Sequence, residues 1–239
     1  MSSLYHEYLV DDREFLDYDD FKKNCRLKTK KDFNFAYDAI DKYVFDFPGK
    51  RALVWINDEG EEKTFTFDDI SRESQKAANW LVSKGIKKGD TVMLILRRRY
   101  EWWILMPALH RIGAIVIPAT DQLLQSDIEY RTNAADVKMI ISYDNSDIQT
   151  EIEKAMPKSK TVKFLVTVGK ELRDGWESFH DEYEKMSDNF PRPQGEAATH
   201  NEDPMLLYFT SGTSGYPKMV LQNEAMLRFM HLRGIWYIL

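Results

Sequence analysis

The sequence contains a single cysteine, Cys25, so no disulfide bond can form within the chain. Proteins of reducing compartments rarely carry disulfide bonds, and we therefore predict a cytoplasmic protein. No signature of a nucleophilic thiol surrounds Cys25, and we expect an inert side chain. The first residues include Glu7, Asp11 and Asp12, which are not typical of a signal peptide or of an acid-poor transit peptide. No apolar run is long enough to span a bilayer.

An excess of basic residues is also missing. There are 33 Lys and Arg against 39 Asp and Glu, which gives a formal net charge of −6. This balance gives no reason to expect nucleic acid or an anionic membrane as a partner. The only tight basic cluster in the body of the chain, Arg97 to Arg99, follows a predicted strand. We interpret it as a solvated strand end, with a phosphate-binding patch as the less favoured alternative.

The five histidines show no pairing at the spacing of metal ligands, so we predict no metal site on this chain. His110 lies in an apolar predicted helix, where we expect a packed and hydrogen-bonded side chain. His231 follows the loop described below, and we expect no catalytic role for it. Trp102 and Trp103 are interpreted as buried core rather than as stacking surfaces for a ligand.

Two common nucleotide-binding motifs do not occur. A P-loop requires Gly, four residues, and then Gly-Lys-Ser/Thr. Neither Gly49-Lys50 nor Gly169-Lys170 has a glycine five residues earlier. The G-x-G-x-x-G pattern of dinucleotide-binding proteins is missing as well. Any nucleotide site must therefore use a different loop.

A candidate for such a loop runs from Thr210 to Lys218 and reads Thr-Ser-Gly-Thr-Ser-Gly-Tyr-Pro-Lys. The apolar run before it, residues 205–209, predicts a buried strand. Glycines allow a close approach of ligand to backbone, and the amide groups of such a turn can form an anion-binding hollow. Hydroxyl groups donate to phosphate oxygens, and the Lys218 ammonium supplies a positive charge. We predict polyphosphate binding by Thr210, Ser211, Gly212, Thr213, Ser214, Gly215 and Lys218.

Short apolar and β-branched runs alternate with helical patterns through most of the chain, which predicts an α/β fold with a doubly wound, largely parallel sheet flanked by helices. Ligands of such sheets bind beyond the carboxyl ends of the strands, where Thr210 falls. A predicted strand pair, residues 52–57 and 63–67, comes first. Further strands are expected at residues 91–96, 114–119, 138–142, 162–168 and 205–209, and helices at residues 33–40, 68–84, 100–111, 126–135, 147–156 and 176–185.

The loop from Thr210 to Lys218 resembles the signature Thr-Ser-Gly-Ser/Thr-Ser/Thr-Gly-x-Pro-Lys of the AMP-forming acyl-CoA synthetases and their adenylating relatives. The segments 89–96, 101–103 and 113–120 are also similar to early elements of that family. The tryptophan pair and the Pro-x-Thr sequence at Pro118 resemble the medium-chain branch most. This resemblance identifies the chain as the N-terminal part of such an enzyme, with a helical lead-in at residues 1–48 and a partial adenylation domain at residues 49–239.

The resemblance implies a ligase that couples a carboxylic acid to coenzyme A with ATP, through an acyl-adenylate. ATP, Mg²⁺, coenzyme A and a small carboxylic acid, in particular a medium-chain fatty acid, are the implied cofactors and partners. The family's adenine-binding, magnesium-binding and catalytic residues fall beyond Leu239, so we expect this chain by itself to be inactive. Two alternatives stay open: a non-catalytic, truncated phosphate-binding fragment, and an adenylating enzyme for another acid, such as acetate, an aromatic acid or an amino acid.

Overall fold

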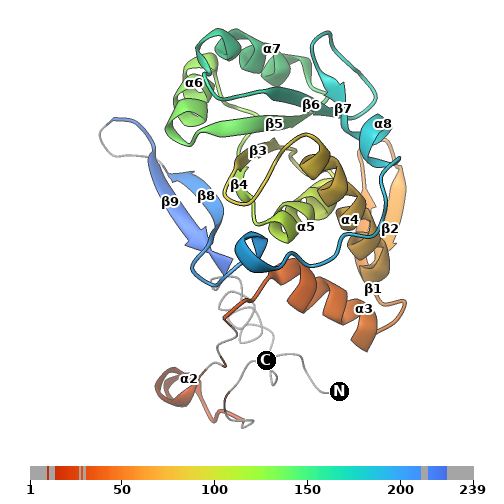
Figure 1. Cartoon of the computed structure of the whole chain (residues 1–239), viewed down its shortest axis with the longest axis vertical. Coiled ribbons are helices and arrows are strands. Elements are labelled where there is room, and N and C mark those ends of the chain that lie inside the picture. Colours follow the sequence, from red (N-terminus) through yellow and green to blue (C-terminus); the bar gives the residue numbers. More distant parts are fainter. Residues whose placement is uncertain (1–9, 11–13, 27, 29–30, 211–214, 225–239) are drawn as a thin grey trace.

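A seven-stranded sheet forms the centre of the fold in the computed structural model, which describes residues 10, 14–26, 28, 31–210 and 215–224 (Figure 1). The strand order is β7-β6-β5-β3-β4-β8-β9, and all neighbouring pairs are parallel except β8 and β9. A separate antiparallel pair precedes the sheet in the chain. The strands are β1 Arg51–Ile56, β2 Glu62–Thr66, β3 Thr91–Ile95, β4 Ile115–Pro118, β5 Val137–Tyr143, β6 Phe164–Val168, β7 Glu177–Ser178, β8 Pro204–Thr210 and β9 Lys218–Asn223.

Helices cover both faces of this sheet, as the sequence predicted. Successive side chains of a strand point to opposite faces. Val92 and Leu94 of β3 accordingly join the core under α4, α5 and α8, while Met93 and Ile95 join the core under α6 and α7. The helices are α2 Tyr18–Asn24, η1 Ala36–Asp41, α3 Lys42–Asp46, α4 Phe67–Ser83, α5 Trp102–Ile112, α6 Gln125–Ala134, α7 Ser146–Ala155, η2 Met156–Lys158, α8 Phe179–Tyr183 and η3 Gly195–Ala197.

Local signals explain where the main helices begin and end. Helix α4 starts with a capping box, in which Thr66 and Asp69 satisfy each other's backbone amides. Helix α5 ends at Gly113, whose φ of 78° is the left-handed conformation that glycine adopts at helix ends. The Asn145 side chain caps α7 by accepting hydrogen bonds from the backbone amides of Asp147 and Ile148.

The helical segment before β1 packs against α4 and α5. Asp41 of η1 forms an ion pair with the fully buried Arg111 of α5, at 2.5 and 2.8 Å. Asn34, also buried, donates from its amide to the carbonyl of His110 at 2.6 Å. Polar contacts therefore bind this segment to the sheet-covering helices. The boundary at residues 48/49 remains a prediction.

The structure differs from the sequence analysis at two helices. The predicted helix at residues 176–185 is wrong at its start, because Glu177–Ser178 pairs with β6 as strand β7 and Ser178 then caps the shorter α8. The helix predicted at residues 33–40 is a π-helix, Ala36–Asp41, that continues into α3. Among the helices that the structure describes, none has both the length and the apolar character needed to cross a membrane.

Candidate phosphate-binding site

The two ends of the predicted phosphate loop lie side by side. Thr210 is the last residue of β8 and Lys218 the first of β9, and the two are paired across the antiparallel ladder. The Thr210 hydroxyl donates to the Lys218 carbonyl at 3.4 Å. Since β8 is parallel to β4, Thr210 lies at the carboxyl edge of the parallel strands, as predicted.

The described part of the loop is open to solvent and suited to an anion. Lys218 is exposed, and no carboxylate of the described residues lies within ion-pair distance of it. Gly215 has a φ of 112°, a conformation that residues with a Cβ rarely adopt, and no atom of the described residues outside its chain neighbours lies within 4 Å of where a Cβ would be. The predicted binding residues Ser211, Gly212, Thr213 and Ser214 lie outside the described residues.

Tyr130 of α6 contacts the loop, a residue that the sequence analysis did not select. Its ring stacks on Tyr216 at a centroid distance of 4.5 Å, and its hydroxyl donates to the Pro217 carbonyl at 3.0 Å. Its other neighbour is Phe209, at 6.1 Å in an edge-to-face arrangement. No motif in the sequence marks this contact, because it joins residues about 87 positions apart in the chain.

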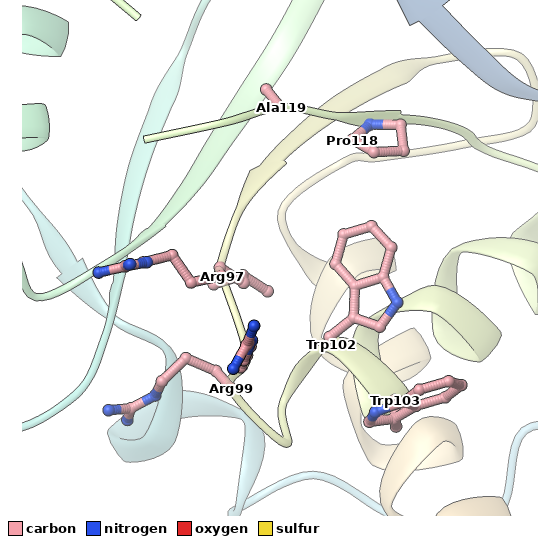
Figure 2. A pocket seen from close by; sticks show the side chains of 8 residues that line it. Arg97, Arg99, Trp102, Trp103, Pro118 and Ala119 are labelled. Atoms are coloured by element: carbon pink, nitrogen blue, oxygen red, sulfur yellow. The ribbon is translucent and has the colours of Figure 1, made fainter. Parts of the chain in front are cut away.

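A hollow of about 520 Å³ lies at the carboxyl ends of β3 and β4, on the same edge of the sheet as Thr210. Arg97 and Arg99 stand on one side of it and Trp102 and Trp103 on the other (Figure 2). The prediction that both tryptophans are buried is wrong: Trp103 is 54% exposed, because the first turn of α5 faces this hollow. The remaining lining residues are Leu96, Arg98, Pro118 and Ala119.

The arginines of this hollow have carboxylate partners, except for the exposed Arg98, whose side chain has no hydrogen bond or ion pair among the described residues. Arg97 adopts a left-handed conformation, with a φ of 45°, and its Nε lies 3.3 Å from Asp121. Arg99 pairs with Glu101 and Asp144. The prediction of a solvated strand end is thus confirmed for Arg97 and Arg98, which are exposed.

Glu101, the residue before α5, is a fully buried carboxylate under the hollow. Burial alone would raise its pKa, but hydrogen bonds from His180 at 3.0 Å and from Arg99 hold the pKa below its usual range. The charge of Arg99 is thereby compensated by the carboxylates of Glu101 and Asp144.

His110 is buried as predicted, but the expectation that it is hydrogen-bonded is wrong. Neither ring nitrogen has a hydrogen-bond partner among the described residues, since apolar side chains and the edge of Phe35 surround the ring. Burial lowers the pKa of His110 to about 4. Burial also raises the pKa of the Cys25 thiol, which makes the reactive thiolate rarer and agrees with an inert side chain. No group of three or more His, Cys, Asp or Glu residues in the described ranges could hold a metal ion.

The AMP-binding enzyme family matches residues 40–234. The chain belongs to this family. The acyl-coenzyme A synthetase ACSM4 of Rattus norvegicus, mitochondrial by its name, is 33% identical over 229 residues, which cover 92% of this chain and 37% of that relative. The mitochondrial synthetase ACSM3 of Pongo abelii is 34% identical over 219 residues, 89% of this chain and 36% of the relative. The chain thus spans little more than a third of these relatives.

A solved structure shares the fold of this chain. The anthranilate CoA ligase AuaEII, crystallised with anthranoyl-AMP, superposes with a TM-score of 0.72 over 82% of this chain and 36% of the ligase, at 23% identity. The family resemblance and the predicted α/β architecture are confirmed by these comparisons.

Proposed function

We propose that this chain is the phosphate-binding portion of an ATP-dependent, AMP-forming carboxylic acid:CoA ligase. The observation that carries the proposal is the pairing of Thr210 with the exposed Lys218 at the carboxyl edge of the sheet, inside the segment that matches the AMP-binding enzyme family. The names of the curated relatives, which are acyl-coenzyme A synthetases, support the same reaction class.

In this reaction an oxygen of the carboxylate attacks the α-phosphorus of ATP, and the bond to the bridging oxygen of pyrophosphate breaks. The sulfur of coenzyme A then attacks the acyl carbonyl of the adenylate and displaces AMP. The Lys218 ammonium would stabilise the charge that develops on the departing pyrophosphate, and the Thr210 hydroxyl would do so after turning away from the Lys218 carbonyl. The residues Ser211, Gly212, Thr213, Ser214 and Gly215 would add backbone and hydroxyl donors.

The described residues fit a polyphosphate, since the site offers donors and an uncompensated cation, but they offer no cluster for Mg²⁺. Mg²⁺ would therefore arrive with ATP, whose phosphate charge it neutralises when bound. We assign no residue of this chain to coenzyme A or to the acyl group.

The test is acid-dependent exchange of pyrophosphate into ATP, measured on the protein encoded by the complete gene. We expect exchange with medium-chain fatty acids, and the panel should also contain acetate, aromatic acids and amino acids. No exchange with any acid would favour the alternative of a phosphate-binding protein without ligase activity. Exchange with aromatic acids alone would replace the fatty acid in the proposal.

Lys218→Ala should weaken ATP binding by about 10- to 100-fold, because a charge-assisted hydrogen bond contributes roughly 1.5–3 kcal/mol. Calorimetry on the purified protein measures this affinity. Lys185→Ala is the matched control, since Lys185 is 72% exposed and lies just after α8, away from the loop. Equal ATP affinities of the two variants would refute the role of Lys218.

The compartment is part of the same proposal. The lone cysteine favours a reducing compartment such as the cytoplasm. The names of the relatives contain the word mitochondrial. Cell fractionation with antibody detection of the native protein distinguishes the two compartments.

A further inference from the structure

One side chain outside the loop touches both of its ends. Tyr130 of α6 meets Phe209, the residue before Thr210, edge to face at 6.1 Å. On the other side of the loop it stacks on Tyr216 at 4.5 Å with an interplanar angle of 17°, and its hydroxyl donates to the Pro217 carbonyl at 3.0 Å. Tyr130 is thus bound both to the end of β8 and to the two residues that lead into Lys218.

The exposure of Tyr216 makes this contact notable. The Tyr216 side chain is 75% exposed, so burial in a core does not fix its position. Among the described residues, the contact that holds the Tyr216 ring is its stack on the ring of Tyr130. A stacked aromatic pair and a hydrogen bond to the adjacent carbonyl restrain the backbone immediately before Lys218.

Tyr130 can serve as a support because α6 is itself anchored. Ile128, two residues earlier, is fully buried in the core under α6 and α7. Asn133 donates to the Lys158 carbonyl at 2.9 Å and thereby ties α6 to the segment after α7. On the loop side, the Arg131 guanidinium lies 4.9 Å from the centre of the Phe209 ring. Because α6 is packed against the sheet and bonded to the segment after α7, Tyr130 gives the loop a fixed point of contact.

We propose that Tyr130 is a positioning residue for ATP, which holds Pro217 and Lys218 in their binding geometry before the nucleotide arrives. This inference rests on the proposed function of the loop. A binding group that is already ordered loses less conformational entropy when its ligand binds. Tyr130 itself need not touch the nucleotide. Its effect on ATP passes through Tyr216 and Pro217.

The experiment compares four variants of the protein encoded by the complete gene, with ATP as the ligand. Tyr130→Phe keeps both aromatic contacts and removes the hydrogen bond to Pro217. Tyr130→Leu removes the stack as well. Tyr216→Leu removes the stack from the exposed side, where the substitution cannot disturb the core. Tyr183→Phe is the control, since it removes a tyrosine hydroxyl on α8, on the opposite face of the sheet.

We expect Tyr130→Phe to weaken ATP binding about 3- to 10-fold and Tyr130→Leu at least about 10-fold, in line with one hydrogen bond and one aromatic pair. Tyr216→Leu should match the loss of stacking, and combining it with Tyr130→Leu should add little, because both remove one contact. In exchange assays the KM for ATP should rise while the KM for the acid stays within about twofold. If Tyr130 only stabilised the fold, the KM for ATP would not rise without a similar rise in the KM for the acid.

The proposal is overturned if Tyr130→Phe and Tyr216→Leu both bind ATP within about twofold of the unaltered protein, or if the KM values for ATP and acid rise together. If Tyr130→Leu fails to fold, the ATP affinity of Tyr216→Leu tests the positioning role instead. Lys218→Ala, measured alongside, tests the proposed function separately from the positioning role of Tyr130. If Lys218→Ala loses ATP binding and the tyrosine variants do not, the proposed function stands and the positioning role is refuted.

Discussion

Removing the carboxylate of Asp41 should strongly destabilise the fold. Asp41 lies on η1, and both of its oxygens accept hydrogen bonds from Arg111. One of them also accepts from Ser71 at 2.7 Å. Arg111 is completely buried, and among the described residues its guanidinium also donates to the serines of α4 and lies over the ring of Tyr37 at 4.9 Å. Asp41→Ala therefore leaves a buried guanidinium without a counter-charge.

The size of the effect follows from this burial. Removing one partner of a buried ion pair costs about 3–5 kcal/mol. We lower this to about 2–4 kcal/mol, because the Asp41 side chain is 30% exposed and water can solvate part of the Arg111 charge once the carboxylate is gone. In a chain of this length, such a loss should lower Tm by about 5–15 °C. Urea unfolding followed by circular dichroism gives the free energy of unfolding directly.

Asp46→Ala is the matched control on the same segment. Asp46 pairs with Lys42 at 2.7 Å one helical turn away, near the surface. Loss of such a pair costs at most about 0.5 kcal/mol. If Asp41→Ala is no more destabilising than Asp46→Ala, the reasoning about the buried pair is refuted. A single unfolding transition would also show that residues before position 49 unfold together with the sheet, against the predicted boundary.

Two further predictions concern His110 and Gly215. Folded His110 has a pKa of about 4, below the 6.5 of an unfolded histidine, so its neutral form is favoured by folding above pH 6.5 and this stability is lost as the pH falls from about 6.5 to 4. The difference in free energy of unfolding between the protein and His110→Leu should accordingly change by on the order of 2–3 kcal/mol over that range, and a constant difference would contradict it. Gly215→Ala strains this backbone conformation by roughly 1–2 kcal/mol, which the solvent-open loop relieves in the free protein by leaving the φ of 112°, so Tm changes little. Regaining that conformation for the ligand should weaken ATP binding by about 5- to 30-fold, and unchanged affinity would show that the φ of 112° is not needed for binding.

The central strands could be predicted from the sequence because local composition determines them. The run at residues 91–96 is apolar on both faces, which is typical of a strand covered by helices on both sides, and the structure has β3 at Thr91–Ile95. The strand before the loop was likewise confirmed as Pro204–Thr210. The loop itself could be recognised because its glycines, hydroxyls and lysine form a contiguous motif.

The contacts that support the site could not be predicted, because they join residues far apart in the chain. The ion pair of Asp41 with Arg111 spans 70 positions and the hydrogen bond of Tyr130 to Pro217 spans 87. Trp103 was misjudged for a related reason, since a tryptophan on an apolar helix is usually buried, whereas the packing of the strands places Trp103 beside the hollow shown in Figure 2. Side-chain chemistry in the sequence therefore indicates the candidate binding residues, whereas tertiary packing determines which residues contact and support them.

The antiparallel pairing of β8 with β9 also fixes the two ends of the loop relative to each other, independently of the residues between them. Thr210 and Lys218 are eight positions apart in the sequence, yet they are direct partners across the ladder. The spacing between their backbones is therefore set by interstrand hydrogen bonds, at about 5 Å, and does not depend on the length of the segment that joins them. Evolution or an engineer could lengthen or exchange the residues between Thr210 and Tyr216, while the backbones of Thr210 and Lys218 stay paired and Tyr216 and Pro217 keep their contacts with Tyr130.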